Sequence, residues 1–230
     1  MNGYSRPLPS KADIVCSCGS SGLGQQLAAI IEDKRPEFTN QPYDKSILKL
    51  RGHLRPVVNR SFETAGFAQR VLGQAAQADA ICTSLLAAPF KDGLRLVEIT
   101  QQVGVECILP DNPFVSMGSG KNTADPFLGF LRSVFWPNSI PTVLEGALAA
   151  YWTIQHAIDM KIFGVGFDVD VFAVEPKDKG FAARKLDDAE LTEHREFIRA
   201  VEDAMRSVRT QMNSAPADSP PTPPPTLNKA

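Results

Sequence analysis

The stretch from Pro113 to Val174 constrains the fold more than any other part of the chain. A strand through Phe114 and Val115 is expected to lead into the turn Gly118-Ser119-Gly120, where glycines accept backbone angles that side chains resist. Two segments with a helical spacing of apolar residues follow, separated by a break that prolines bound, and an alternating, strand-like pattern closes the stretch. Two helices that each carry one apolar face need a sheet to cover, so we expect helices and strands packed in layers.

Capping signals and periodicity predict where these two helices lie. Asp125 followed by Pro126 predicts the start of the first helix, because aspartate caps helices and proline suits the first helical position. The apolar positions are Phe127, Leu131, Val134 and Phe135 in the first helix, and Leu144, Leu148, Tyr151, Ile154 and Ile158 in the second. The closing strand is expected to run from Phe167 to Val174, where apolar residues alternate with aspartates near its start.

Composition indicates one globular domain followed by a tail. The chain has 230 residues, of which 43% are hydrophobic and 22% charged, as is ordinary for a soluble globular protein. The net charge of −2 gives no electrostatic reason to expect a nucleic acid or an anionic membrane as a partner. The start of the chain lacks the apolar core of a secretory signal, and no apolar run approaches the ~20 residues that span a bilayer. We therefore expect a cytoplasmic protein.

The four cysteines favour a structural interpretation over a metal or redox site. Cys16 and Cys18 are one residue apart and would share a face of a strand, while Cys82 and Cys107 lie far away in the sequence. This spacing is not that of a CxxC motif, and no second cysteine or histidine pair completes a zinc site. We expect small buried thiols in a reduced cytoplasm, with no metal and no cofactor.

The front of the chain predicts a strand, a turn and two helices. Residues 12–17 form a short strand pattern, a glycine-rich turn follows, and a helix is expected over residues 25–34. Residues 36–58 carry prolines and charges with little periodicity, so they are interpreted as a loop or a variable insertion. A second helix is expected over residues 62–76.

A run of strands then leads into the central stretch. Apolar residues 80–90 predict a strand, and Lys91-Asp92-Gly93 turns the chain into a second strand over residues 94–99, as in a β-hairpin. A third strand is expected over residues 103–109. Paired helices together with antiparallel strands imply an α+β layered domain rather than a doubly wound one.

The end of the chain predicts a charged helix and a tail. Residues 187–212 carry a narrow apolar stripe of Leu191, Ile198, Val201, Met205 and Val208, with acids at the start and arginines at the end, which suits the helix dipole. A stripe this narrow favours docking on the chain's own domain over recruiting a partner. Residues 213–230 are proline-rich and are expected to be a disordered tail.

The order and spacing of these motifs resemble the second half of a proteasome-type subunit of the N-terminal-nucleophile (Ntn) hydrolases. The similar segments are Phe114–Gly120, Phe127–Trp136, Val143–Asp159, Gly164–Gly166 and Asp168–Val174, preceded by the front segment ADIVCSCGSSG. The resemblance covers roughly Lys11 to Val174 and implies a four-layer αββα sandwich over residues 1–180, with two antiparallel sheets between two helical layers. It also implies that copies of the chain, or a related subunit, stack into rings through their helices.

The resemblance also implies a catalytic scheme and five matching positions. In this family a residue at the processed N-terminus, usually threonine, attacks an amide while its own α-amino group acts as base. A backbone N–H after the central strand holds the oxyanion. Gly19 matches the oxyanion-hole glycine, Ser20 and Ser21 would flank the substrate strand, Ser119 matches the serine near the nucleophile, and Asp159 matches the aspartate that supports the amine.

The chain departs from the family pattern in its catalytic residues. The strands that carry the nucleophile should precede Lys11, and no threonine occurs before Thr39. The catalytic lysine of the family would fall near Ser5 and Arg6, and neither position holds a lysine. Ile162 also occupies the position of an expected serine. The sandwich is therefore expected to be N-terminally incomplete, and two functions stay open: a non-catalytic assembly subunit, or an active threonine-type peptidase or amidase whose true start lies upstream.

Other chemical motifs are weaker than this resemblance. The segment GSGKNT at Gly118–Thr123 lacks the first glycine of a P-loop and the hydroxyl residue directly after the lysine. The glycines between Gly19 and Gly24 have the wrong spacing for a dinucleotide-binding turn. His156 and Asp159 share a helical face, but a dyad would need Cys82 or Ser119 beside them, and an interfacial ion pair is favoured.

Overall fold

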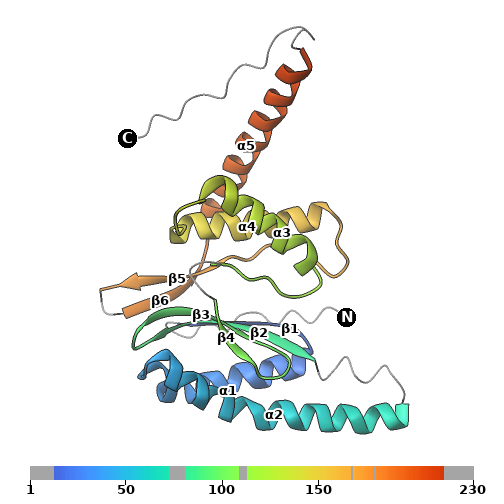
Figure 1. The fold of residues 1–230 in the computed structure, drawn as a ribbon, viewed down its shortest axis with the longest axis vertical. Helices are drawn as coiled ribbons and strands as arrows, with labels where there is room; N and C mark the ends of the chain where they lie inside the picture. The colour runs from blue at the N-terminus through green and yellow to red at the C-terminus, as the bar shows by residue number, and fades with distance from the viewer. Residues whose placement is uncertain (1–12, 73–80, 109–112, 167, 179, 215–230) are drawn as a thin grey trace. The chain divides into compact units, whose positions relative to one another are not determined.

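The computed structural model describes residues 13–72, 81–108, 113–166, 168–178 and 180–214. The chain divides into two compact units, residues 1–187 and residues 188–230, and each is described by itself. The first unit has an α+β architecture of helices and antiparallel strands, which confirms the expected class (Figure 1).

A four-stranded antiparallel sheet forms the centre of the first unit. Its strands, in spatial order, are β1 (Ile14–Gly19), β2 (Cys82–Phe90), β3 (Gly93–Ile99) and β4 (Val105–Cys107). The predicted hairpin is confirmed: Phe90 pairs with Gly93, and Lys91 and Asp92 form the two-residue loop. The third predicted strand is shorter than residues 103–109, and its last residue lies outside the described part of the chain.

Two long helices cover one face of this sheet. α1 (Ser21–Thr39) and α2 (Tyr43–Leu72) pack on each other and enclose one hydrophobic core with the sheet (Figure 1). Along β2, every second side chain is buried against these helices, in the strand alternation that the sequence predicts. The largest fully buried side chains of this core are those of Leu27, Ile31, Phe38, Leu50, Leu54, Leu86, Val97 and Ile99.

The predicted loop over residues 36–58 is wrong. α1 continues through Pro36 to Thr39, and α2 runs from Tyr43 through Pro56. Each proline removes one backbone hydrogen bond from its helix. The apolar residues around them nevertheless recur at helical spacing and are buried, which outweighs that loss: Phe38, Ile47, Leu50, Leu54 and Val58. The helix expected over residues 62–76 is the last part of α2, and residues 73–76 lie outside the described part of the chain.

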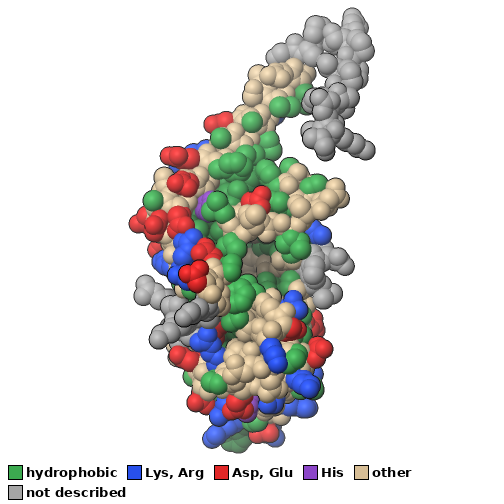
Figure 2. Space-filling model, turned by 90° about the vertical axis from the view of Figure 1, so that its left-hand side faces the viewer, with side chains coloured by type: hydrophobic (Ala, Val, Ile, Leu, Met, Phe, Trp, Pro, Cys, Tyr) green, Lys and Arg blue, Asp and Glu red, His purple; other side chains and the backbone are tan. Residues whose placement is uncertain are grey.

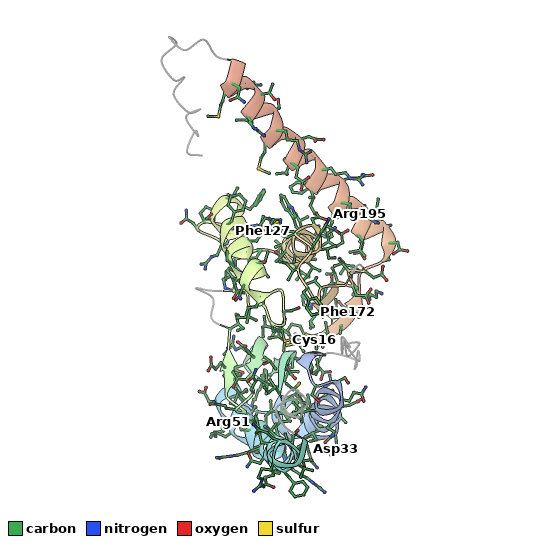
Figure 3. All side chains as sticks on the ribbon, turned by 90° about the vertical axis from the view of Figure 1, so that its right-hand side faces the viewer. Cys16, Asp33, Arg51, Phe127, Phe172 and Arg195 are labelled. Atoms are coloured by element: carbon green, nitrogen blue, oxygen red, sulfur yellow. The ribbon has the colours of Figure 1, made fainter. Side chains whose placement is uncertain are left out.

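The central stretch forms a second pair of helices. α3 (Lys121–Phe135) and α4 (Val143–Asp159) pack through aromatic side chains, with Phe127 and Phe135 both against Trp152. A capping box between Thr142 and Glu145 begins α4. Figures 1 and 3 show these helices on the opposite side of the sheet from α1 and α2.

The Asp125-Pro126 helix start is also wrong, because the first residue of α3 is Lys121 and not Pro126. Asp125 caps nothing. Its carboxylate instead accepts hydrogen bonds from the Ser116 hydroxyl and from Lys121 one turn before it. Phe114 and Val115, expected in a strand, have no regular secondary structure.

A two-stranded sheet replaces the single predicted closing strand. β5 (Phe172–Lys177) starts later than expected, and β6 (Gly180–Lys185), which the sequence analysis missed, pairs with it antiparallel. The Leu186 N–H donates to the Val171 C=O at 2.9 Å. Because hydrogen-bonded and non-hydrogen-bonded residues alternate along an antiparallel pair, the backbone nitrogen of Pro176 points away from β6. Because proline has no N–H, it fits this outer edge of β5, and the EPK sequence is compatible with a strand there.

The second unit is described by one helix. α5 (Asp188–Ser214) confirms the helix expected over residues 187–212. Residues 215–230 of the proline-rich segment lie outside the described part of the chain. Among the described residues, no helix combines the length and the apolar character needed to cross a bilayer.

Candidate functional site

Gly19 ends β1 in a conformation that suits glycine. Its φ of +101° lies in a region that side chains rarely adopt, and an added Cβ would lie 2.2 Å from the Ile81 carbonyl oxygen. The next residue, Ser20, donates its N–H to that same oxygen at 2.8 Å. Because hydrogen-bonded and non-bonded positions alternate along an antiparallel pair, the N–H of Gly19 points away from β2, toward the other edge of β1.

Ser20 and Ser21 have helix-starting roles in the structure. Ser20 is the N-cap of α1, and its hydroxyl accepts a hydrogen bond from the Leu23 N–H at 3.3 Å. Ser21 is the first residue of α1 and is exposed. Both residues therefore lie directly beside the outward-pointing backbone of Gly19.

The loop before α3 lies against this end of β1. A Cβ added to Gly118, which has a φ of +88°, would lie 3.7 Å from the Cβ of Cys18. The backbone of Gly118 also works to lower the pKa of the Cys18 thiol, against the larger effect of burial, which raises it. The contact between Cys18 and Gly118 joins two segments that are 100 residues apart in the sequence.

The turn after α4 meets the same loop. The Ser119 hydroxyl lies 2.8 Å from the position that a Cβ on Gly164 would take, and Gly164 itself has a φ of +83°. A Cβ added to Gly120 would similarly lie 3.3 Å from a methyl carbon of Val165. The end of β1, the loop 118–120 and the turn 161–165 therefore converge in one region, which we call the Gly19–Ser119 region.

Asp159 stands at the margin of this region. It is the last residue of α4, it is exposed, and it accepts a hydrogen bond from Gln155 at 2.9 Å. The turn that follows it passes through Lys161, with a φ of +56°, before it reaches Gly164. Of the five family-matched positions, Gly19, Ser20 and Ser21 lie together at the end of β1. Ser119 reaches the region through its loop, and Asp159 leads into it.

A polar cluster holds the loop before α3. Lys121 donates to the Ser116 carbonyl at 3.0 Å and pairs with Asp125 at 2.8 Å, while the Ser116 hydroxyl donates to the same carboxylate. Burial works to raise the pKa of Asp125, but the hydrogen bonds from Lys121 and Ser116 outweigh it and lower that pKa. The ionised carboxylate thereby joins the loop to the first turns of α3.

The thiols near the region are protonated at neutral pH. Burial raises the pKa of Cys16 to about 11 and also raises the pKa of Cys18 and of Cys82. Figure 3 shows Cys16 on the side of the sheet that faces β5, opposite α1 and α2. A thiol is a poor nucleophile until it loses its proton, which favours a structural role for these cysteines. Of the thiols expected to be buried, Cys82 is buried, whereas Cys16, Cys18 and Cys107 are partly exposed.

The histidine near the region is engaged in packing. His156 stacks on Phe127 with 4.2 Å between ring centroids and 14° between ring planes. His53 lies on α2, where it hydrogen-bonds Glu37 at 3.0 Å. Within the described ranges, no group of three or more histidine, cysteine, aspartate or glutamate side chains could hold a metal ion.

Three contacts of this region were missed in the sequence analysis. The packing of Cys18 on Gly118 and of Ser119 on Gly164 joins distant segments and leaves no local pattern. The Lys121–Asp125 pair did have a signal, because oppositely charged residues four apart on a helix are neighbours. The interpretation of Asp125 as a helix cap places Lys121 outside the helix, so this spacing of opposite charges is overlooked.

Comparison with known proteins gives fold similarity and no sequence match. No family model matches the chain, and no curated protein matches its sequence. The structure is similar to Anbu (ancestral beta-subunit) from Yersinia bercovieri, with a TM-score of 0.59 at 17% identity over 95% of this chain and 87% of that one. It is also similar to Anbu from Hyphomicrobium sp. strain MC1, with a TM-score of 0.56 at 14% identity over 95% of this chain and 88% of that one. A Gly-1 mutant of Anbu from that strain gives a TM-score of 0.57 at 14% identity, over 91% and 86% of the two chains. At these identities the similarity shows the fold.

Proposed function

We propose that this chain is a subunit of a proteasome-like assembly, built on the four-layer αββα sandwich of the Ntn hydrolases. The observation that carries the proposal is the fold similarity to Anbu over 95% of this chain, together with the convergence of family-matched positions in the Gly19–Ser119 region. In this proposal, α1 and α2 form one outer layer, and α3 and α4 form the other. The two sheets, β1–β4 and β5–β6, lie between them.

Exposed apolar side chains on the second helical layer support assembly through that layer. Phe130 and Val134 on α3 and Val143, Leu144 and Ile154 on α4 are exposed although they are large and apolar. Such side chains on neighbouring helices are typical of a surface that another protein covers. We infer that copies of the chain, or a related subunit, meet through α3 and α4 in a ring.

The mass of the full chain in solution tests this assembly. Leu144→Glu places a charge on the proposed contact surface, whereas Asn138→Glu places the same charge in the exposed turn between α3 and α4. Native mass spectrometry should give an oligomer for the unchanged chain and for Asn138→Glu, and smaller species for Leu144→Glu. A monomer in all three samples would contradict the proposal.

We propose that the subunit is non-catalytic, because the described side chains offer no activated nucleophile. The thiols of Cys16, Cys18 and Cys82 have raised pKa values, and His156 is stacked on Phe127. A hydroxyl nucleophile needs an adjacent base that can take its proton. Assembly is then the function of this chain.

A threonine-type peptidase or amidase is the second candidate, and the geometry at Gly19 favours it. The outward-pointing N–H of Gly19 is a donor of the kind that holds an oxyanion, and Ser119 and the turn after Asp159 converge on the same region. In this alternative, an N-terminal nucleophile outside the described residues completes the site.

One experiment on protein isolated from its natural source separates these two candidates. The protein is treated with an electrophile that acylates N-terminal hydroxyl or thiol nucleophiles, and its intact mass and N-terminal sequence are then determined. Labelling of an N-terminal threonine, serine or cysteine would establish the hydrolase and overturn the non-catalytic proposal. An unlabelled chain with another N-terminal residue supports the assembly role.

A further inference from the structure

The apolar stripe of α5 has the spacing of a coiled-coil seam. When His194 and Met212 are added to the stripe, its positions are separated alternately by three and four residues over three heptads: Leu191, His194, Ile198, Val201, Met205, Val208 and Met212. These are the a and d positions of a heptad, with a at Leu191 and d at His194. The narrow stripe is expected to dock on the chain's own domain, but a regular two-position seam of this length is also the pattern with which one helix packs on another.

The second half of the seam is exposed. Leu191 and Ile198 are buried, whereas Met205, Val208 and Met212 are 48%, 55% and 74% exposed. Figure 2 shows hydrophobic side chains among charged ones along α5, in the upper part of the view. Three large apolar residues in register on one face of a helix are a surface without a cover among the described residues.

We propose that α5 pairs with α5 of a second copy of this chain as a short antiparallel coiled coil over residues 201–212. In the register that centres the pair between Met205 and Val208, each a residue meets a d residue of the other helix. Val201 then packs on Met212 of the second copy, and Met205 packs on Val208 of the second copy. By symmetry this gives four layers, and every exposed seam residue is used.

The charges beside the seam favour this orientation. Glu202 and Arg209 occupy e positions, directly after the d residues Val201 and Val208. The antiparallel register brings Glu202 of each helix nearest to Arg209 of the other, which gives two pairs of opposite charge. In a parallel pair, e residues face g residues, and the g positions of this half are Phe197, Ala204 and Gln211, which carry no charge.

The same arrangement identifies the partner as a second copy. The register is self-complementary, because each layer and each charged pair recurs once under the two-fold axis. Glu202 is also held on the helix surface by Arg206, at 3.2 Å, so its carboxylate is oriented before the second helix arrives. The flexible side chains of Met205 and Met212 can fill the irregular space between the two helices.

Substitutions in the full chain test whether the seam mediates association. Val208→Glu places a charge in the seam, and Ser207→Glu places the same charge on the adjacent exposed position outside it. In sedimentation-equilibrium experiments, the weight-average mass should fall at least twofold for Val208→Glu and stay unchanged for Ser207→Glu. Circular dichroism checks that both variants keep the helix content of the unchanged chain. An unchanged mass for a folded Val208→Glu variant would overturn the proposal.

Charge reversal tests the orientation. Glu202→Arg and Arg209→Glu should each weaken association at least fivefold, because each places like charges opposite one another. The double variant should recover to within about twofold of the unchanged chain, because the pair is restored with its signs exchanged. The contact of residue 202 with Arg206 is lost in both Glu202→Arg and the double variant, so recovery reports the pair between helices. If the double variant is no stronger than the single variants, the antiparallel register is wrong.

This inference is independent of the proposed ring. Leu144→Glu changes the proposed contact surface on α4 and Val208→Glu changes the seam on α5, so each substitution disrupts a different proposed contact between copies. A chain that loses mass with Val208→Glu and not with Leu144→Glu would support α5 pairing and contradict the ring through α3 and α4.

Discussion

At the scale of single residues, the backbone angle of Gly19 gives the sharpest expectation. We expect Gly19→Ala to destabilise the fold by about 2 kcal/mol or more, because the new methyl group would have to displace the Ile81 carbonyl at an unfavourable φ. Gly22→Ala is the matched control, since Gly22 lies in α1 with no atom within 4 Å of an added Cβ. That variant should be more stable by roughly 0.5–1 kcal/mol. Denaturant unfolding of both variants measures the difference, and equal stabilities would contradict it.

Asp125 gives an expectation about acid stability. Its pKa is lowered in the folded protein, so it stabilises the fold above its unfolded pKa of about 3.9, and this contribution disappears as the pH falls through the folded value. Because the side chain is partly exposed, we expect Asp125→Asn to lose about 1 kcal/mol or less at pH 7. The difference between the two proteins should shrink toward zero below about pH 4. Urea unfolding across this range measures it, and a gap that widens on acidification would show that the sign is wrong.

The cysteines give an expectation about reactivity. Burial raises the pKa of Cys16, Cys18 and Cys82, so in the folded protein at pH 7.5 they should react with iodoacetamide at least tenfold more slowly than in denaturant. Peptide mass spectrometry after timed alkylation gives the rate at each site. Fast labelling of Cys18 in the folded protein would indicate an activated thiol in the Gly19–Ser119 region and would weaken the structural interpretation.

At the scale of elements, the prolines inside α1 and α2 are tolerated at a cost. We expect Pro36→Ala to stabilise the protein by about 1–2 kcal/mol. The restored helical hydrogen bond and the removal of the clash between the proline ring and the preceding turn stabilise the folded state by up to about 3 kcal/mol. The greater conformational freedom of alanine in the unfolded chain offsets about 1 kcal/mol of this gain. Pro42→Ala is the control, because Pro42 precedes α2 and interrupts no helix. A higher denaturation midpoint for Pro36→Ala than for Pro42→Ala is the expected result, and the reverse order would show that Pro36 is compatible with its helix.

The same prolines show why the sequence predicted some elements and missed others. The β2–β3 hairpin was predictable because its turn and its alternating strands are both local signals. The loop predicted over residues 36–58 depends on their prolines and charges, and it overlooks the helical spacing of Ile47, Leu50, Leu54 and Val58, whose burial decides the structure. β6 was missed because its small and charged residues gain their strand structure from pairing with β5.

The candidate site was predictable only through the resemblance to the Ntn hydrolases. Gly19 and Ser119 were singled out by matching positions in that family, and the sequence between them gives no sign that their segments meet. The contacts that join them, Cys18 to Gly118 and Ser119 to Gly164, depend on the packing of the whole first unit. Long-range packing of this kind follows from the fold and not from local propensity.

At the scale of the whole molecule, the two proposed association surfaces differ in chemistry. The surface on α3 and α4 is built from large apolar side chains such as Val134 and Leu144, whereas the seam of α5 is flanked by Glu202 and Arg209. Burial of apolar area is insensitive to moderate salt and is strengthened by excluded salts. Charged pairs at the rim of an interface lose attraction as ions screen them.

Salt should therefore separate the two association steps. The screening length falls from about 10 Å at 0.1 M salt to about 3 Å at 1 M. We expect this change to weaken the α5-dependent step about two- to fivefold, measured in the Leu144→Glu background, where α5 pairing is the remaining contact. In the Val208→Glu background, the contact through α3 and α4 should be unchanged or stronger over the same range. Sedimentation equilibrium at both salt concentrations measures each step. If salt instead strengthens association in the Leu144→Glu background, the Glu202–Arg209 pairs do not contribute, and the seam associates through its apolar residues alone.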